Sequence, residues 1–249
     1  MIDIHSHVLP FVDDGADDMD TAIEMLTMAK GNGTSVIVAT PHCNMPGVFD
    51  SDIQRIKKVF IDLKNEMKIR ETGIHLAMGM EVFGTEDTAE KLSDGKLLTI
   101  NNTKYPLVEF DFLEEEEYIF YVLSKIIDKG YVPVIAHPER YECFAQRPEE
   151  LFNLYKMGAV IQINKGSVLG AFGEKAEMVS DIILSHRLAA VAASDAHSDI
   201  YRTTDLSGFA KYLDENYGDG CSPLLLKENP GRILQNKDIF WENPMPISF

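Results

Sequence analysis

Short apolar runs rich in β-branched residues alternate with longer amphipathic stretches along the whole chain. The short runs have the length and composition of buried strands. We expect seven strands, at Ile2–His5, Ser35–Ala39, Leu76–Glu81, Leu107–Phe110, Val132–Ala136, Val160–Asn164 and Ala189–Ala193. The longer stretches repeat apolar residues at helical spacing and predict helices over Met19–Lys30, Asp52–Arg70, Tyr118–Lys129, Glu149–Met157 and Ala176–His186. Four of these helices are followed by a glycine of the kind that ends helices, namely Gly33, Gly73, Gly130 and Gly158. Regular alternation of strand and helix predicts an α/β fold with parallel strands and right-handed crossovers.

Each predicted strand ends in side chains that can bind a metal ion or a phosphate. In strand order, these side chains are His5 and His7, His42, Glu81, Glu109, His137 with Arg140, Asn164 with Lys165, and Asp195 with His197. In a barrel the loops at the carboxyl ends of all strands build the active site, whereas an open sheet gathers such groups at one switch point. The sequence therefore favours a distorted seven-stranded (β/α)7 barrel. No repeat or linker divides the sequence, so residues 1–249 are expected to form a single domain.

The charge of the chain excludes some partners. The formal net charge is −17, with 40 acidic residues against 23 basic ones. Nucleic-acid binding and residence on an anionic membrane both need clustered Lys and Arg, so neither is expected. No apolar run is long enough to cross a bilayer, and Cys43, Cys143 and Cys221 show no paired spacing. We expect a protein of the reducing cytoplasm, in which part of the negative charge binds divalent cations.

Five of the seven histidines lie at predicted strand ends. His5 and His7 are two residues apart, so their side chains project to the same face of a strand. Imidazole combined with carboxylates suits zinc, manganese or iron, and this distribution favours a metal site. The other two histidines fit structural roles, because His75 precedes a strand and His186 closes a helix, where an imidazolium is favourable.

Several short motifs together resemble the polymerase-and-histidinol-phosphatase (PHP) superfamily. They are Asp-Ile-His-Ser-His near the start, Asp13-Asp14-Gly15, Thr40-Pro41-His42, Gly79-Met80-Glu81, His137-Pro138-Glu139-Arg140 and Ser194-Asp195-Ala196-His197. Within it, the chain is most similar to the bacterial tyrosine-protein phosphatases of capsule and exopolysaccharide synthesis. Glu109, where many superfamily members carry histidine, also points to this branch. The resemblance implies a PHP-type distorted (β/α)7 barrel with three divalent ions, manganese first and iron or zinc as alternatives.

The resemblance also implies which residues hold each ion. The first ion would take His5, His7, Glu81 and Asp195; the second would take Glu81, Glu109 and His137; the third would take Asp14, His42 and His197. Asp14 is placed by the resemblance alone, and spacing does not separate it from Asp13.

The resemblance implies hydrolysis of phosphotyrosine in the tyrosine-rich tail of a bacterial tyrosine kinase, by attack of a metal-bridging hydroxide. Arg140 and Arg202 are expected to bind the phosphate, since a guanidinium binds phosphate through two parallel hydrogen bonds. A cysteine nucleophile is set aside, because none of the three cysteines is followed six residues later by arginine.

Three other functions can be weighed against the sequence. A small-molecule phosphatase of the histidinol-phosphatase type would share the metal site. A metal-dependent nuclease conflicts with the acidic composition. A metal-free regulatory relative conflicts with the complete ligand set. The physiological metal, the oligomeric state, the general acid and the packing of the tail Trp241–Phe249 are not determined by the sequence.

Overall fold

The computed structural model describes residues 1–49 and 52–248. All strand pairs in it are parallel, in one sheet of order β1-β2-β4 and one of order β3-β5-β6-β7-β8-β9. The strands are β1 (Ile2–Ser6), β2 (Val36–Ala39), β3 (His42–Cys43), β4 (His75–Met78), β5 (Glu81–Phe83), β6 (Leu107–Glu109), β7 (Val134–Ala136), β8 (Val160–Asn164) and β9 (Ala189–Ala193).

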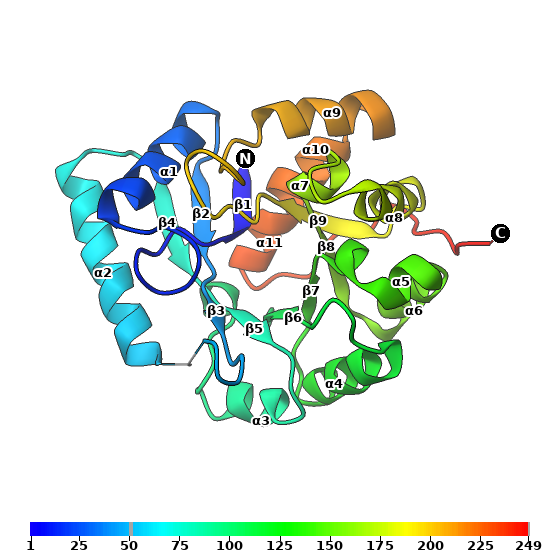
Figure 1. The fold of residues 1–249 in the computed structure, drawn as a ribbon. Coiled ribbons are helices and arrows are strands. Elements are labelled where there is room, and N and C mark those ends of the chain that lie inside the picture. The colour runs from blue at the N-terminus through cyan, green and yellow to red at the C-terminus, as the bar shows by residue number, and fades with distance from the viewer. Residues whose placement is uncertain (50–51, 249) are drawn as a thin grey trace.

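The two sheets join into a closed ring of seven strand positions. β2 runs on into β3 after two residues, and β4 runs on into β5 in the same way, so each pair continues one strand position across both sheets. Pro41 lacks the N–H that an unbroken second strand would need. At the other junction β9 meets β1 through a parallel bridge between Ser6 and Ala196, where His7 N donates to Ala196 O at 2.8 Å. The predicted seven-stranded α/β barrel is confirmed, with its second and third strands each split in two (Figure 1).

The five predicted helices are all present within about two residues of their expected ends. They are α1 (Met19–Gly31), α2 (Ile53–Ile69), α4 (Glu116–Asp128), α6 (Glu150–Met157) and α8 (Glu174–Ser185). The Asp18 and Asp52 side chains cap α1 and α2 by accepting from backbone N–H groups three residues later. The four glycines expected to end helices have positive φ, a conformation that costs glycine little.

The sequence pattern did not predict the remaining helices and turns. They are α3 (Thr88–Ser93), α5 (Glu142–Gln146), α7 (Lys165–Val168), α9 (Ser207–Tyr217), α10 (Cys221–Pro223), α11 (Asn229–Leu234), the 3₁₀ turns Ile100–Asn102 and Pro138–Arg140, and the π turn Leu224–Glu228. Several of them follow strand ends, and they shape the loops around the polar end of the barrel.

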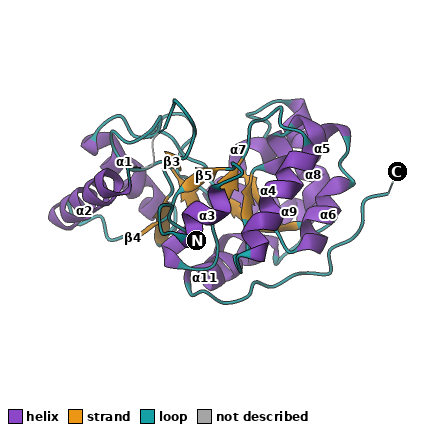
Figure 2. Cartoon of the chain, turned by 90° about the horizontal axis from the view of Figure 1, so that it is seen from below, coloured by secondary structure: helices purple, strands orange, loops and turns teal. Residues whose placement is uncertain are grey.

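Both faces of the strands are buried, and alternate residues enter different apolar clusters. Ile37, Val108 and Ile135 join the larger cluster with helices α1, α4 and α6. Val38 and Leu107 join the smaller one, which Ile233 of α11 and Trp241 complete. Figure 2 shows the strands between α1 and α2 on one side and α4, α6 and α8 on the other. The core thereby holds the strands rigid while their carboxyl ends stay free for polar groups.

The C-terminal segment packs against the barrel rather than lying loose. Phe240 N donates to Asn229 Oδ1 at 2.7 Å, and Met245 N donates to His186 O at 2.9 Å. Trp241 meets the ring of Tyr155 edge-on at 4.8 Å. Within the part of the chain that is described, no helix is both long and apolar enough to span a membrane.

Candidate metal centre

The predicted ligands come from different strand ends and gather at one place. Their ligand atoms form three groups in which all atoms lie within 4.8 Å of one another. The groups are His5, His7, Glu81 and Asp195; His7, Asp14, His42 and His197; and His42, Glu81 and Glu109. His137 joins them through Nε2, which lies 2.9 Å from Glu81 Oε1. All nine residues predicted as ligands therefore meet.

The first group is fully buried and has the same four members that the family resemblance implied. The Nε2 atoms of His5 and His7 lie 3.3 Å apart and face Glu81 Oε2 at 3.1 and 3.2 Å. Burial alone would raise the pKa of Glu81, but the histidines around it hold that pKa well below its ordinary value. Burial likewise opposes ionisation of Asp195, yet its pKa is also held well below the usual range by His5, His7 and Arg202. Both carboxylates are thus kept ionised, as metal ligands must be.

The buried donor set fits divalent cations. Within the described residues, Glu81 Oε2 and His137 Nδ1 are buried and form no hydrogen bond, although three imidazole nitrogens lie 3.1–3.2 Å from Glu81 Oε2. Buried polar atoms normally have a hydrogen-bond partner, and mixed imidazole and carboxylate atoms at this spacing suit manganese, iron or zinc. Burial lowers the pKa of His137 and of His197, which favours the neutral imidazole that a metal requires.

The group of His42, Glu81 and Glu109 contains His42 where the set expected for the second ion has His137. Glu109 was expected beside Glu81 and His137, but its Oε1 lies 2.7 Å from His42 Nδ1. His42 Nδ1 also lies 3.1 Å from Glu81 Oε2, so this ring stands between the two glutamates. Burial, together with the charge on Glu81, raises the pKa of Glu109 to about 7.

The structure gives Asp13 and Asp14 different surroundings. Asp14 is exposed on 57% of its side chain and points Oδ1 at the Nε2 atoms of His42 and His197, 3.5 Å from each. Asp13 is buried, with Oδ2 2.7 Å from His7 Nδ1, and it also accepts from the backbone N–H groups of His42 and Gly15. The geometry favours Asp14 as the ligand and Asp13 as the group that orients His7.

A buried amide chain supports the first group; Asn164 was noted at a strand end from the sequence, whereas Gln162 was missed. Gln162 Oε1 accepts from His5 Nδ1 at 2.9 Å, which leaves His5 Nε2 free for a metal. Gln162 Nε2 donates to Asn164 Oδ1 at 2.7 Å, and Asn164 Nδ2 donates to Asp195 Oδ2 at 2.5 Å. The available signal was two polar residues, at alternate positions, in the apolar run Val160–Asn164.

Both predicted phosphate-binding arginines lie at the centre. Arg202 Nη2 donates to Asp195 Oδ2 at 2.6 Å, and Arg140 Nη1 lies 3.7 Å from the same oxygen. His137, Asp195 and Arg202 have φ of 37°, 49° and 23°. Such strained conformations in bulky residues concentrate at functional sites, where the surrounding structure maintains them.

The residues expected to lie outside the site do so. His75 begins β4 at the opposite end of the barrel. His186 follows α8, and its Nδ1 lies 2.9 Å from the backbone oxygen of Ile182 in the last turn. Cys43 is close to the centre but buried, and burial raises the pKa of its thiol well above the ordinary value, which disfavours a thiolate nucleophile.

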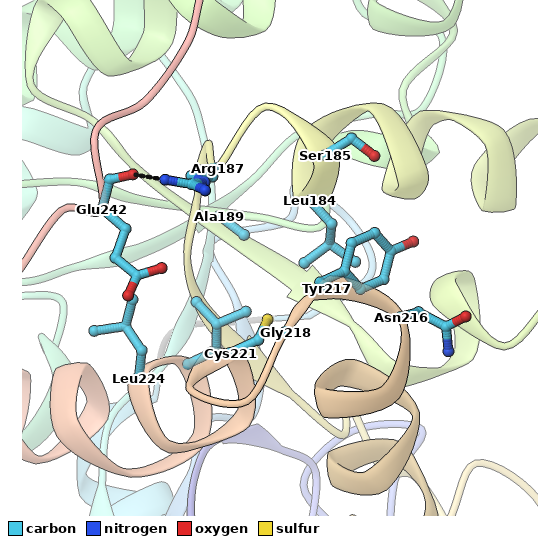
Figure 3. A pocket seen from close by; sticks show the side chains of 11 residues that line it. Leu184, Ser185, Arg187, Ala189, Asn216, Tyr217, Gly218, Cys221, Leu224 and Glu242 are labelled. Atoms are coloured by element: carbon cyan, nitrogen blue, oxygen red, sulfur yellow. Dashed lines mark hydrogen bonds between the residues drawn. The ribbon is translucent and has the colours of Figure 1, made fainter.

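A separate cavity of about 380 Å³ lies where β9 begins, between α8, α9 and the C-terminal segment. Figure 3 shows Arg187 in its lining, with its guanidinium bonded to the backbone oxygen of Glu242. Tyr217 and Cys221 line other parts of the cavity. None of its lining residues belongs to the three ligand groups. This cavity is therefore distinct from the metal centre.

Comparison with known proteins places the whole chain beside one group of enzymes. A family model for capsular polysaccharide synthesis, CpsB/CapC, matches residues 1–235. The tyrosine-protein phosphatase YwqE of Bacillus subtilis (strain 168) is 34% identical over 247 residues, which are 99% of this chain and 96% of YwqE. The tyrosine-protein phosphatase CpsB of Streptococcus agalactiae is 31% identical over 241 residues, 95% of this chain and 99% of CpsB.

Solved structures agree with these relatives. One crystal structure, from work on YwqE of Bacillus subtilis and CpsB of Streptococcus pneumoniae as metal-dependent tyrosine phosphatases, matches with a TM-score of 0.93. It is 34% identical, and the match covers 100% of both chains. Histidinol phosphate phosphatase from Lactococcus lactis matches with a TM-score of 0.57 at 19% identity, over 87% of this chain and 93% of that one. That second likeness shows a shared fold alone.

Proposed function

This chain belongs to the CpsB/CapC family of capsular polysaccharide synthesis, and we propose that it is a metal-dependent phosphatase that hydrolyses phosphotyrosine in proteins. The observation that carries the proposal is the convergence of nine ligand residues beside two arginines, in a chain similar to YwqE along nearly its whole length. We further propose that the centre holds three divalent ions, with manganese as the preferred metal.

The ligand residues would divide among the ions as follows. His5, His7, Glu81 and Asp195 would hold the first ion, as their common group supports. Glu81, Glu109 and His137 would hold the second, and Asp14, His42 and His197 the third. When bound, the ions supply positive charge for the phosphate oxygens and lower the pKa of water so that it can act as the nucleophile.

The side chains of this protein then bind and orient the phosphate. Arg140 and Arg202 both direct guanidinium donors at Asp195 Oδ2, on the edge of the first ligand group. From there they can donate to phosphate oxygens and neutralise charge as it develops during attack on phosphorus. Asp13 and Gln162 keep His7 and His5 in the tautomers that expose Nε2.

The proposed substrate is the phosphorylated, tyrosine-rich tail of a bacterial tyrosine kinase that controls capsule or exopolysaccharide synthesis, and the proposed place of reaction is the cytoplasm. The names of the relatives support this substrate class, since YwqE and CpsB are named as tyrosine-protein phosphatases. The catalytic centre itself would serve any phosphate monoester, so the substrate must be tested directly.

The deciding experiment is hydrolysis of a tyrosine-phosphorylated peptide by the purified protein, with manganese, without it and after EDTA. Histidinol phosphate is assayed beside the peptide. We expect phosphate release from the peptide that depends on manganese and stops after EDTA. A preference for histidinol phosphate would overturn the tyrosine phosphatase assignment and keep the metal centre. Absence of hydrolysis with manganese, iron and zinc would overturn both.

A further inference from the structure

An aromatic side chain that binds no metal contacts both arginines of the centre. The ring centroid of Phe172 lies 4.4 Å from Arg140 Cζ and 5.4 Å from Arg202 Cζ. Arg140 also contacts a second ring, that of Phe112, at 4.2 Å. A guanidinium is attracted to the face of an aromatic ring, and the attraction grows when water is excluded. These contacts can hold the guanidinium groups of Arg140 and Arg202 in place.

The loop around Phe172 accommodates its ring through a glycine. A Cβ atom added to Gly166 would lie 2.6 Å from Phe172 Cε2 and 2.8 Å from Cζ, closer than atoms can approach. Gly170 and Gly173, on either side of Phe172, have φ of 75° and 94°, which glycine adopts at little cost. The ring thus lies directly on the Gly166 backbone, on the side of the loop that faces the arginines.

The arginines need such support because they lie among competing partners. Both reach toward one oxygen, Asp195 Oδ2, which already accepts from Asn164. A guanidinium held only by that carboxylate could adopt several orientations. Binding a phosphate through two parallel hydrogen bonds requires a single orientation. Packing against an aromatic face restricts the guanidinium and leaves its N–H groups free to donate.

We propose that Phe172 is a positioning residue for the phosphate-binding arginines, and that its ring packs against the backbone of Gly166. This inference rests on the proposed function, because it takes phosphate to be the group that Arg140 and Arg202 bind. Phe172 acts through the arginines and touches none of the nine ligands in the contacts described. It therefore belongs to phosphate binding and not to metal binding.

The test is Phe172→Leu in the manganese-loaded protein. We expect KM for the phosphotyrosine peptide and the inhibition constant for inorganic phosphate each to rise about tenfold, as loss of a partly buried cation–π contact predicts. Manganese content and the thermal midpoint should stay at the wild-type values. Gly166→Ala should change the same two constants in the same direction, since its Cβ displaces the ring.

A matched control is available elsewhere in the chain. Phe240 contacts the guanidinium of Arg232 at 3.9 Å, far from the nine ligands in sequence and in an exposed setting. Phe240→Leu removes the same kind of ring–guanidinium pair and should leave both constants unchanged. In an Arg140→Ala background, Phe172→Leu should have a smaller effect than in the wild type, because one of its two targets is gone.

The outcomes separate this inference from the proposed function. Wild-type KM and phosphate inhibition in Phe172→Leu, with an active wild type, would overturn the positioning role alone. Loss of manganese from the variant would also overturn it, since Phe172 would then support the metal centre. If the wild type hydrolyses no phosphotyrosine peptide, binding of inorganic phosphate measured by calorimetry still tests whether Phe172→Leu weakens the arginines' hold on phosphate.

Discussion

Asp13 and Asp14 are neighbours in the chain, but the structure places their carboxylates in different positions. Asp13 is buried against His7 Nδ1, and Asp14 faces the Nε2 atoms of His42 and His197. A carboxylate that orients a ligand histidine changes metal affinity, whereas a direct ligand changes how many ions bind. Replacing Asp13 should therefore change metal affinity, whereas replacing Asp14 should change the number of ions bound.

We predict that Asp13→Asn weakens metal binding about 10- to 100-fold without changing the number of ions at saturation. Asp14→Ala should lower the saturating metal content by about one ion per chain, because it removes a donor of the third site. Metal titration followed by elemental analysis checks both. Equal stoichiometry in the two variants would contradict the roles assigned here.

His42 belongs to two ligand groups, and Asp195 joins the first group to Arg202, so the loss of either should be severe. His42 lies within reach of Asp14, Glu81 and Glu109, while Asp195 meets His5 and Arg202. We predict that His42→Ala and Asp195→Ala each lower kcat at least about a thousandfold, as loss of metal chemistry implies. Circular dichroism should report an intact fold. Wild-type turnover by either metal-loaded variant would refute the site assignment.

The junction of β1 and β9 closes the barrel and contains a buried pair of side chains, Asp3 and Ser194. Asp3 accepts from Ser194 N at 3.1 Å and from Ser194 Oγ at 2.5 Å, and both residues are buried. Burial raises the pKa of Asp3, and the bonds from Ser194 oppose that rise. A buried carboxylate that loses a donor is left partly unsatisfied, which costs more than the bond itself contributes.

We predict that Ser194→Ala lowers the free energy of unfolding by about 1–3 kcal/mol. Urea denaturation of the metal-free proteins checks this value, so that metal affinity does not contribute. Ser124→Ala is the control, because Ser124 Oγ donates to the backbone oxygen of Tyr121 at an exposed helical position. An equal loss of stability in both variants would show that the β1–β9 pair has no special role.

The elements also show how far the sequence predicts this molecule. Helices with a long amphipathic repeat were placed within about two residues, because periodicity and end signals are local. The split of the third strand was missed; at the break the backbone packs closely, and a Cβ on Gly79 would approach Ile100 Cα at 3.3 Å. Ligands at strand ends were found as local signals, whereas Gln162 and Phe172 act through partners far away in the chain. Such long-range contacts leave no periodic pattern to follow.

In the whole molecule, the candidate metal centre and the C-terminal segment lie at different places on the barrel. The nine proposed ligands gather at one end of the barrel, and the C-terminal segment packs against other parts of the molecule. A net charge of −17 does not prevent this arrangement, because four ligand carboxylates belong to the site where divalent cations are expected. The family model ends at residue 235, so the segment beyond it lies outside the matched region.

Residues 236–248 form hydrogen bonds with side chains of the barrel. Tyr105 Oη donates to Lys237 O at 2.8 Å, and Asn229 exchanges two hydrogen bonds with the backbone of Phe240. Ile247 is buried as well, while Phe249 lies outside the described residues. Removing this segment exposes part of the smaller apolar cluster, to which Trp241 contributes.

We predict that truncation after Gln235 lowers the free energy of unfolding by about 3 kcal/mol, the sum of a few lost hydrogen bonds and one exposed apolar surface. Thermal and urea denaturation measure the loss. Manganese content and kcat at low temperature should stay at full-length values, because the segment contacts none of the nine ligands in the interactions described. If truncation abolishes metal binding while the barrel stays folded, the stability of the molecule and its metal centre are coupled through the tail. Unchanged midpoints would instead show that the contacts of Trp241 and Phe240 contribute nothing measurable to the fold.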